Sequence, residues 1–132
     1  MPLPRRKAKF LSEPRTFAYD HASVSASASV KLWTVPAGRS YRIARVVYNN
    51  PTGLASNGVN YFTINVLNAA LVSASRATSA ASLGADAPIE MPISATPANA
   101  VLPAGTTLSI NLALTGAATL PAGRVVIEGD LI

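Results

Sequence analysis

The sequence predicts an all-β protein: a single antiparallel β-sandwich of seven or eight strands, jelly-roll-like in topology, with an extended N-terminal arm. Three observations predict it. Apolar and polar residues alternate with a period of two over several short segments, as they do in half-buried strands. Turn-forming residues separate these segments, and one turn tripeptide, Pro-Ala-Gly, occurs three times. At 132 residues the chain has the size of one domain and can bury roughly two-thirds of its unfolded surface.

The strictest alternation is in residues 23–35, where valine, alanine and leucine alternate with serine and lysine. A strand with such faces is buried on one side only. Other alternating or apolar runs predict further strands at residues 41–48, 61–67, 71–76, 89–93, 106–114 and 124–132. Pro92 lies inside one of these runs, so that strand is expected at the edge of a sheet.

Two of the connecting segments are long. Residues 49–60 are rich in Asn, Gly and Pro, which predicts a surface loop. Residues 77–88 are rich in Ala and Ser, and we expect them to be irregular. A helix over residues 69–83, ended by Gly84, is the competing interpretation. It would have few large apolar residues to bury, so we rank it second.

The Pro-Ala-Gly tripeptides predict tight corners between strands. Proline at the second position of a turn sets φ in advance, and glycine at the fourth accepts a left-handed backbone. We therefore expect at least one of the three glycines to have a positive φ. The turn residues predicted in this way are Pro36, Gly38, Pro103, Gly105, Pro121 and Gly123.

Positive charge is concentrated at the start of the chain. The net charge is +5, yet residues 16–132 carry six basic and five acidic residues and are nearly neutral. Residues 1–15 contain three prolines, which argue against a helix. We interpret residues 1–15 as an extended basic arm that lies across a neighbouring protein, and residues 16–132 as the β-sandwich domain. The partner-binding residues predicted in the arm are Arg5, Arg6, Lys7, Lys9, Phe10 and Arg15.

The composition excludes several classes of chemistry. The chain has no cysteine, which excludes disulfides and thiolate metal sites, and it has no apolar run of the ~20 residues that a membrane helix needs. The basic N-terminus lacks a following hydrophobic stretch, so it is not a secretory signal.

Charged residues make up 13%, about half the usual fraction. Such a surface either faces another protein or is simply neutral and rich in small residues.

No arrangement of residues predicts catalysis. The single histidine, His21, follows Asp20, and neighbours in a strand point to opposite faces. The acidic residues are scattered, and recognised nucleophile, phosphate-binding and zinc motifs are missing from the sequence. We therefore expect no enzyme, no catalytic residues, no cofactor and no metal. Two sets of residues are left open between a role in protein contact and an ordinary structural role: the arginines Arg39, Arg42 and Arg45, and the aromatic residues Tyr41, Tyr48, Tyr61 and Phe62.

The stretch Trp33–Ile43, followed by Val46–Gly53, resembles small β-sandwich decoration (cement) proteins on the heads of tailed bacteriophages. The shared layout is Val-Pro-Ala-Gly, an aromatic residue, a strand and an Asn-Pro-Thr-Gly loop, and it covers residues 30–67. The resemblance implies a structural virion protein that binds the outside of the capsid and clamps neighbouring major capsid protein subunits. It also implies contacts between copies of the chain, no membrane, and a location on the capsid surface after synthesis in the host cytoplasm.

Two alternatives belong to other functional classes. A jelly-roll viral coat protein would bind packaged nucleic acid through its basic arm. Five basic residues neutralise few phosphates, and only Phe10 could stack on a base, so we expect no direct contact with nucleic acid. A receptor- or glycan-binding virion protein would use Trp33 and the tyrosines as stacking platforms.

Overall fold

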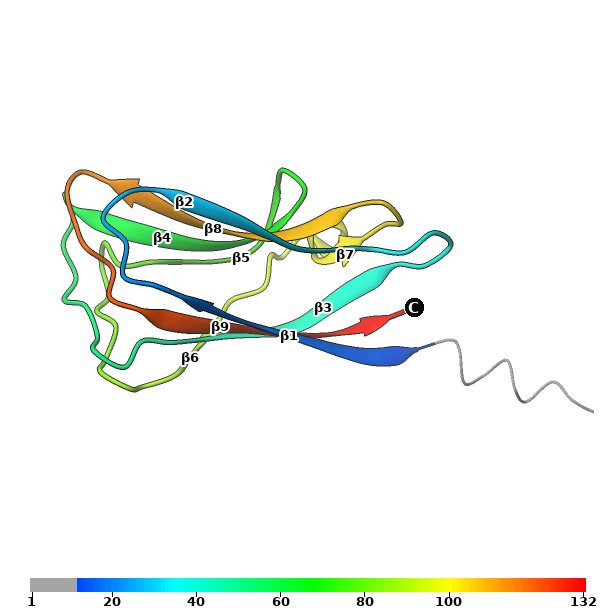
Figure 1. Ribbon diagram of the computed structural model, residues 1–132, viewed down its shortest axis with the longest axis horizontal. Coiled ribbons are helices and arrows are strands. Elements are labelled where there is room, and N and C mark those ends of the chain that lie inside the picture. The colour runs from blue at the N-terminus through cyan, green and yellow to red at the C-terminus, as the bar shows by residue number, and fades with distance from the viewer. Residues whose placement is uncertain (1–11) are drawn as a thin grey trace, which may run out of the picture.

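The structure, a computed structural model, describes residues 12–132, which form two antiparallel β-sheets packed face to face (Figure 1). The strands are β1 (Glu13–His21), β2 (Ala28–Thr34), β3 (Tyr41–Asn49), β4 (Tyr61–Asn68), β5 (Leu71–Ala77), β6 (Ile89–Met91), β7 (Val101–Leu102), β8 (Thr107–Thr115) and β9 (Gly123–Leu131). Helical structure among residues 12–132 is limited to a single 3-10 turn, η1 (Pro97–Ala100).

The order of the strands is that of a jelly roll. Sheet I has the order β1-β9-β3-β6, with β7 also paired to β3, and sheet II has the order β2-β8-β4-β5. The short strands β6 and β7 pair with the two ends of β3, so together they form one interrupted strand. Counted in this way, eight strands divide between two sheets as jelly rolls require. The predicted fold class is therefore confirmed.

The core lies between the sheets and is formed by every second residue of the long strands. In β4, half-buried residues alternate with buried ones along the whole strand. β8 and β9 contribute leucine, isoleucine and valine in the same way. Tyr41, Tyr48 and Phe62 are fully buried, so these three aromatic residues belong to the core. Burying one such side chain contributes about 1.5–3 kcal/mol.

The first strand corrects the predicted domain boundary. β1 begins at Glu13 and pairs with β9 over nine residues, so residues 13–15 belong to sheet I and not to the arm. Its inward residues are Arg15, Phe17, Tyr19 and His21, an alternation that the sequence shows but that Pro14 and the charged residues obscure. Proline fits here because β1 is an edge strand. The remaining arm residues, 1–11, lie outside the described residues.

Two of the three Pro-Ala-Gly tripeptides form corners at the predicted places, but each turn lies one residue later than expected. The Arg39 amide donates to the Pro36 carbonyl oxygen, and the Thr106 amide donates to that of Pro103, so proline is first and glycine third in each turn. Gly38 has φ +76° and Gly105 has φ +82°, both in the left-handed region. The prediction that at least one of the three glycines has a positive φ is therefore confirmed. Gly123 does not have a positive φ and is the buried first residue of β9. Glycine is required there for space: a Cβ atom would lie 2.6 Å from the Tyr48 hydroxyl and 2.8 Å from the Asn49 carbonyl oxygen.

The remaining predicted segments agree with the structure apart from two strands that are shorter than expected. The strand predicted at residues 89–93 ends at Met91, before Pro92. Within residues 23–35 the strand itself spans only β2, and Val24 forms an isolated bridge with Leu120. A bulge between Lys31 and Trp33 lets Val30, Leu32 and Trp33 all pack against the core. The competing helix over 69–83 is wrong, because β5 occupies residues 71–77 and residues 78–83 form no helix.

The glycines separate two physical effects that a stability measurement can distinguish. Gly38→Ala introduces only backbone strain, because nothing lies within 4 Å of its Cβ position, and we expect it to cost about 1–2 kcal/mol. Gly123→Ala brings a methyl group onto Tyr48 and His21, so we expect a larger loss, about 2–4 kcal/mol. Urea unfolding measures both. Gly58→Ala is the matched control, since that glycine has neither a positive φ nor a close neighbour. Equal losses at positions 38 and 123 would contradict this account.

Candidate interaction surfaces

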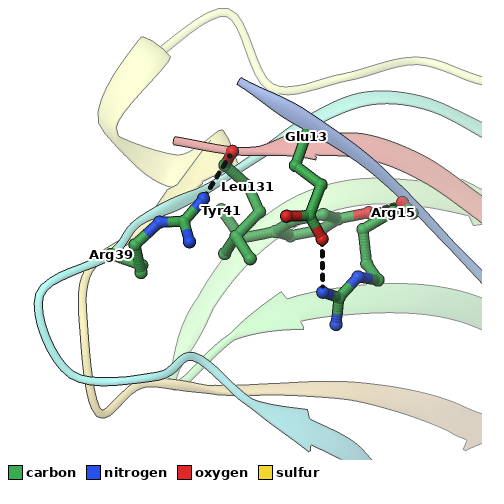
Figure 2. Close-up of polar contacts among 5 residues, drawn as sticks. All are labelled: Glu13, Arg15, Arg39, Tyr41 and Leu131. Atoms are coloured by element: carbon green, nitrogen blue, oxygen red, sulfur yellow. Dashed lines mark hydrogen bonds and ion pairs between the residues drawn. The ribbon is translucent and has the colours of Figure 1, made fainter. Parts of the chain in front are cut away.

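Arg15, the one predicted partner-binding residue that the structure describes, is held by residues of its own chain. Its guanidinium lies 2.8 Å from the Glu13 carboxylate (Figure 2). It also lies 5.4 Å from the centre of the Trp33 ring. The hydrogen bond from Arg15 holds the pKa of Glu13 below its ordinary value. Arg15 thus fixes the start of β1 against Trp33 of β2. Arg5, Arg6, Lys7, Lys9 and Phe10 lie outside the described residues, so their predicted role stays a prediction.

An aromatic cluster lies beneath Arg15 at the junction of the two sheets. The ring centres of Phe17 and Trp33 are 5.0 Å apart, and Tyr41 meets both rings edge-on at 5.6 and 5.4 Å. Edge-to-face contacts of this kind contribute about 0.5–1.5 kcal/mol beyond the area they bury. The cluster joins β1 and β3 of sheet I to β2 of sheet II.

Two tyrosines of β3 fasten the two ends of β1. The Tyr41 hydroxyl donates a hydrogen bond of 2.7 Å to the Arg15 carbonyl oxygen (Figure 2), and the Tyr48 hydroxyl lies 2.7 Å from His21 Nε2. Strand β9 lies between β3 and β1, so both side chains pass beneath it. They do so at glycines: a Cβ on Gly129 would lie 2.8 Å from the Tyr41 hydroxyl, and one on Gly123 would lie 2.6 Å from that of Tyr48. Glycine on β9 is therefore what allows β3 to reach β1.

The hydrogen bonds around His21 assign its tautomer. His21 Nδ1 lies 2.8 Å from the Ala22 carbonyl oxygen, which only accepts, so Nδ1 carries the proton. Nε2 then accepts from the Tyr48 hydroxyl, which in turn accepts from Asn50 Nδ2 at 3.1 Å. Burial raises the pKa of the Tyr48 and Tyr41 phenols, so both hydroxyls keep the proton that they donate. His21 serves as a buried structural residue.

A depression of about 350 Å³ lies beside this network, at the end of sheet I. Asp20, His21, Asn49 and Arg124 line it together with Pro51 and the 122–123 backbone. Most of its polar side chains have partners within the chain, but Asn49 Oδ1 is buried without a hydrogen-bond partner among the described residues. Arg124 forms two hydrogen bonds, of 2.6 and 3.0 Å, with the Asp20 carboxylate and holds the pKa of Asp20 below its ordinary value. The arrangement braces the ends of β1 and β9, and it offers a ligand few free polar groups.

The outer face of sheet I carries most of the charge among residues 12–132. Arg45 pairs with Glu90 on one side and lies 3.8 Å from Glu128 on the other. The charged residues on this face are Asp20, Arg42, Arg45, Glu90, Arg124, Glu128 and Asp130. The side chains that form its ion pairs are 44–68% exposed, so the face is hydrated and its charges are largely balanced. Arg42 and Arg45 belong here, whereas Arg39 lies at the corner before β3 and donates to the Leu131 carbonyl oxygen (Figure 2).

The outer face of sheet II has the opposite character. Its residues are small and polar or apolar, and Lys31 is its one charged residue among the strands described. Tyr61 lies on this face, half-buried, and not in the core. Sequence reasoning noted the low overall charge but could not assign it to one face, because that requires the pairing of all four strands.

Residues 12–132 hold neither a metal-binding cluster nor a helix that could cross a membrane. No group of three or more His, Asp or Glu side chains within that range could hold a metal ion. In the same range, no helix is long and apolar enough to cross a membrane.

The tyrosine contacts predict a local effect on β1. Tyr41→Phe removes the donor to the Arg15 carbonyl, and Tyr48→Phe removes the donor to His21. We expect each to cost about 1–2 kcal/mol and to speed amide hydrogen exchange at opposite ends of β1, near residue 15 and near residue 21 respectively. Tyr61→Phe on the outer face of sheet II is the control. Uniform exchange along β1 in both variants would show that the hydroxyls do not hold its ends.

The comparisons with known proteins do not place the chain in a family. No protein-family model, no curated protein and no solved structure matches it.

Proposed function

We propose that this chain is a structural virion protein that binds the outside of a bacteriophage capsid and clamps neighbouring major capsid protein subunits. The observation that carries the proposal is the strand order, because double-sheet jelly rolls are the fold of many viral capsid domains, as well as of lectins and cupins. Since a fold alone does not imply a function, the resemblance to phage decoration proteins selects among these classes.

The segment that carries the resemblance has a defined place in the fold. Trp33–Ile43 spans the end of β2, the Gly38 corner and the start of β3, and so links sheet II to sheet I. The Asn-Pro-Thr-Gly sequence follows β3 directly, where Asn50 Oδ1 accepts hydrogen bonds from the Thr52 and Gly53 backbone amides. The same segment supplies Trp33 and Tyr41, which fasten β1. It is thus the part of the fold that supports the start of β1.

A clamp needs an attachment that transmits load into the folded body. The basic segment precedes β1, and β1 is fastened by nine residue pairs with β9 and by the contacts of Arg15 and Tyr41. Any partner that binds residues 1–11 would therefore be coupled to sheet I. The protein would act at the virion surface, after synthesis in the host cytoplasm, and without a membrane.

Capsid particles that lack the protein should assemble with normal geometry but release their DNA at lower temperature. A protein that binds only the intact shell stabilises each site by RT ln(1 + [L]/Kd), about 2.7 kcal/mol at a hundredfold excess over Kd. Heat-induced DNA release from particles with and without the protein measures this directly. Equal release temperatures would overturn the capsid role.

Deleting residues 1–11 should leave the sandwich folded but weaken its attachment to shells. The deletion must stop before Glu13, because residues 13–15 belong to sheet I. Circular dichroism and urea unfolding check the fold, and sedimentation with shells that lack the protein measures binding. Substituting Arg42, on the outer face of sheet I, by Ala is the control for loss of positive charge alone. A truncated protein that binds as tightly as the full chain would show that the arm does not clamp.

The coat-protein alternative is supported by one observation, the concentration of basic residues in the first fifteen positions. Binding to DNA or RNA through that segment would fall steeply as salt is raised. Tight binding of the purified protein to nucleic acid at physiological salt would favour this alternative over capsid decoration.

A further inference from the structure

We propose that the outer face of sheet II is a docking surface for a second copy of this chain, packed face to face about a two-fold axis. The inference does not depend on the capsid role, because it concerns the purified chain alone. It rests on the hydrogen bonding, the charge and the area of this face.

A row of hydrogen-bonded side chains crosses all four strands of sheet II. Ser29, Asn111, Asn65 and Ser75 lie opposite one another in register on β2, β8, β4 and β5. Ser75 Oγ donates to Asn65 Oδ1 at 2.9 Å, Asn65 Nδ2 to Asn111 Oδ1 at 3.2 Å, and Asn111 Nδ2 to Ser29 Oγ at 2.8 Å.

This row lowers the free-energy cost of removing the polar groups of the face from water. A polar group costs little on burial when it already has a hydrogen-bond partner, and here each side chain has one within the sheet. Each amide also keeps a second N–H and a second lone pair, which a facing polar surface can use. The residues beside the row add small or apolar groups, such as Ala113, Leu67 and Val72, and Val72 is 41% exposed.

The distribution of charge selects this face and its occupant. The outer face of sheet I would bring seven charged residues into any contact, whereas that of sheet II brings only Lys31. A nearly uncharged face is matched by another nearly uncharged face, because neither has to desolvate unpaired charge. The face of sheet II in a second copy meets this requirement.

A two-fold arrangement also keeps the lysines apart. An axis that runs along the strands between β8 and β4 places β2 of each copy over β5 of the other. Lys31 then lies over the row that holds Leu67 and Val72 of the second copy. With strands about 4.8 Å apart, the two Lys31 backbones are offset by about 14 Å across the strands, in addition to the ~10 Å between the facing sheets.

The area of the face is sufficient for a dimer. Four strands span about 19 Å across, and eight residues of strand span about 26 Å along, which gives about 500 Å² for each copy. The two copies together bury about 1,000 Å², the size at which a specific interface begins. We therefore expect a dimer that dissociates in the micromolar range, with sheet I of each copy facing solvent.

Analytical ultracentrifugation of the full chain tests the proposal. The wild type should sediment as a dimer of about 27 kDa, twice the 13.6 kDa chain, at tens of micromolar. Ser109→Arg, next to the row on β8, should raise the dimer dissociation constant at least tenfold without breaking the row. Asn111→Arg, within the row, should do the same. Val126→Arg, a half-buried outward position at the centre of sheet I, is the matched control and should leave the dimer intact.

A mixing experiment separates a lost interface from a damaged fold. Ser109→Glu alone should be monomeric, and a mixture of the Ser109→Glu and Ser109→Arg variants should form mixed dimers, detected by native mass spectrometry. A wild type that stays monomeric at these concentrations would overturn the proposal. So would a dimer that survives both Ser109→Arg and Asn111→Arg, or one that Val126→Arg or removal of residues 1–11 dissociates instead.

Discussion

Two tyrosine side chains that pass beneath β9, Tyr41 and Tyr48, connect the other two long strands of sheet I. β3 and β1 are not neighbours, since β9 lies between them, yet Tyr41 and Tyr48 connect them at both ends. Their rings fit because β9 has glycine at positions 129 and 123, where any side chain would overlap a phenol. The strand at the centre of this contact therefore has gaps in its inward face. Each hydroxyl is satisfied by a group on β1, so the edge strand contributes the last partners of the core.

The alternation of apolar and polar residues predicts most strands and the fold class, because in those strands the polarity of each residue matches the burial of its side chain. The same criterion does not predict β1. Its inward residues are Arg15, Phe17, Tyr19 and His21, and this mixture of polar and aromatic residues is not typical of a buried strand face. Those side chains are buried or packed by partners from β2 and β3, far away in the sequence. Local pattern could not supply those partners.

The three Pro-Ala-Gly tripeptides show the same difference between features set by the local sequence and features set by contacts with distant residues. Two of them have the backbone that turn chemistry predicts, and the third has glycine because of what packs against it. The surfaces follow this rule as well. The sequence shows that the body of the protein is nearly neutral, but the separation of a charged face from an uncharged one depends on strand order. Neither the row of Ser29, Asn111, Asn65 and Ser75 nor the ion pairs of sheet I can be found without the register.

The position of β1 determines how the domain would bear a mechanical load. A pull on the chain ahead of Glu13, directed along the strand, stretches all the hydrogen bonds between β1 and β9 together, because the two strands slide past each other. A pull directed away from the sheet would instead open the ladder one pair at a time, beginning at Glu13. The contacts of Arg15 with Trp33 and with Tyr41 lie at that end. The molecule is thus reinforced where peeling would start, and its resistance to tension should depend strongly on the direction of the force.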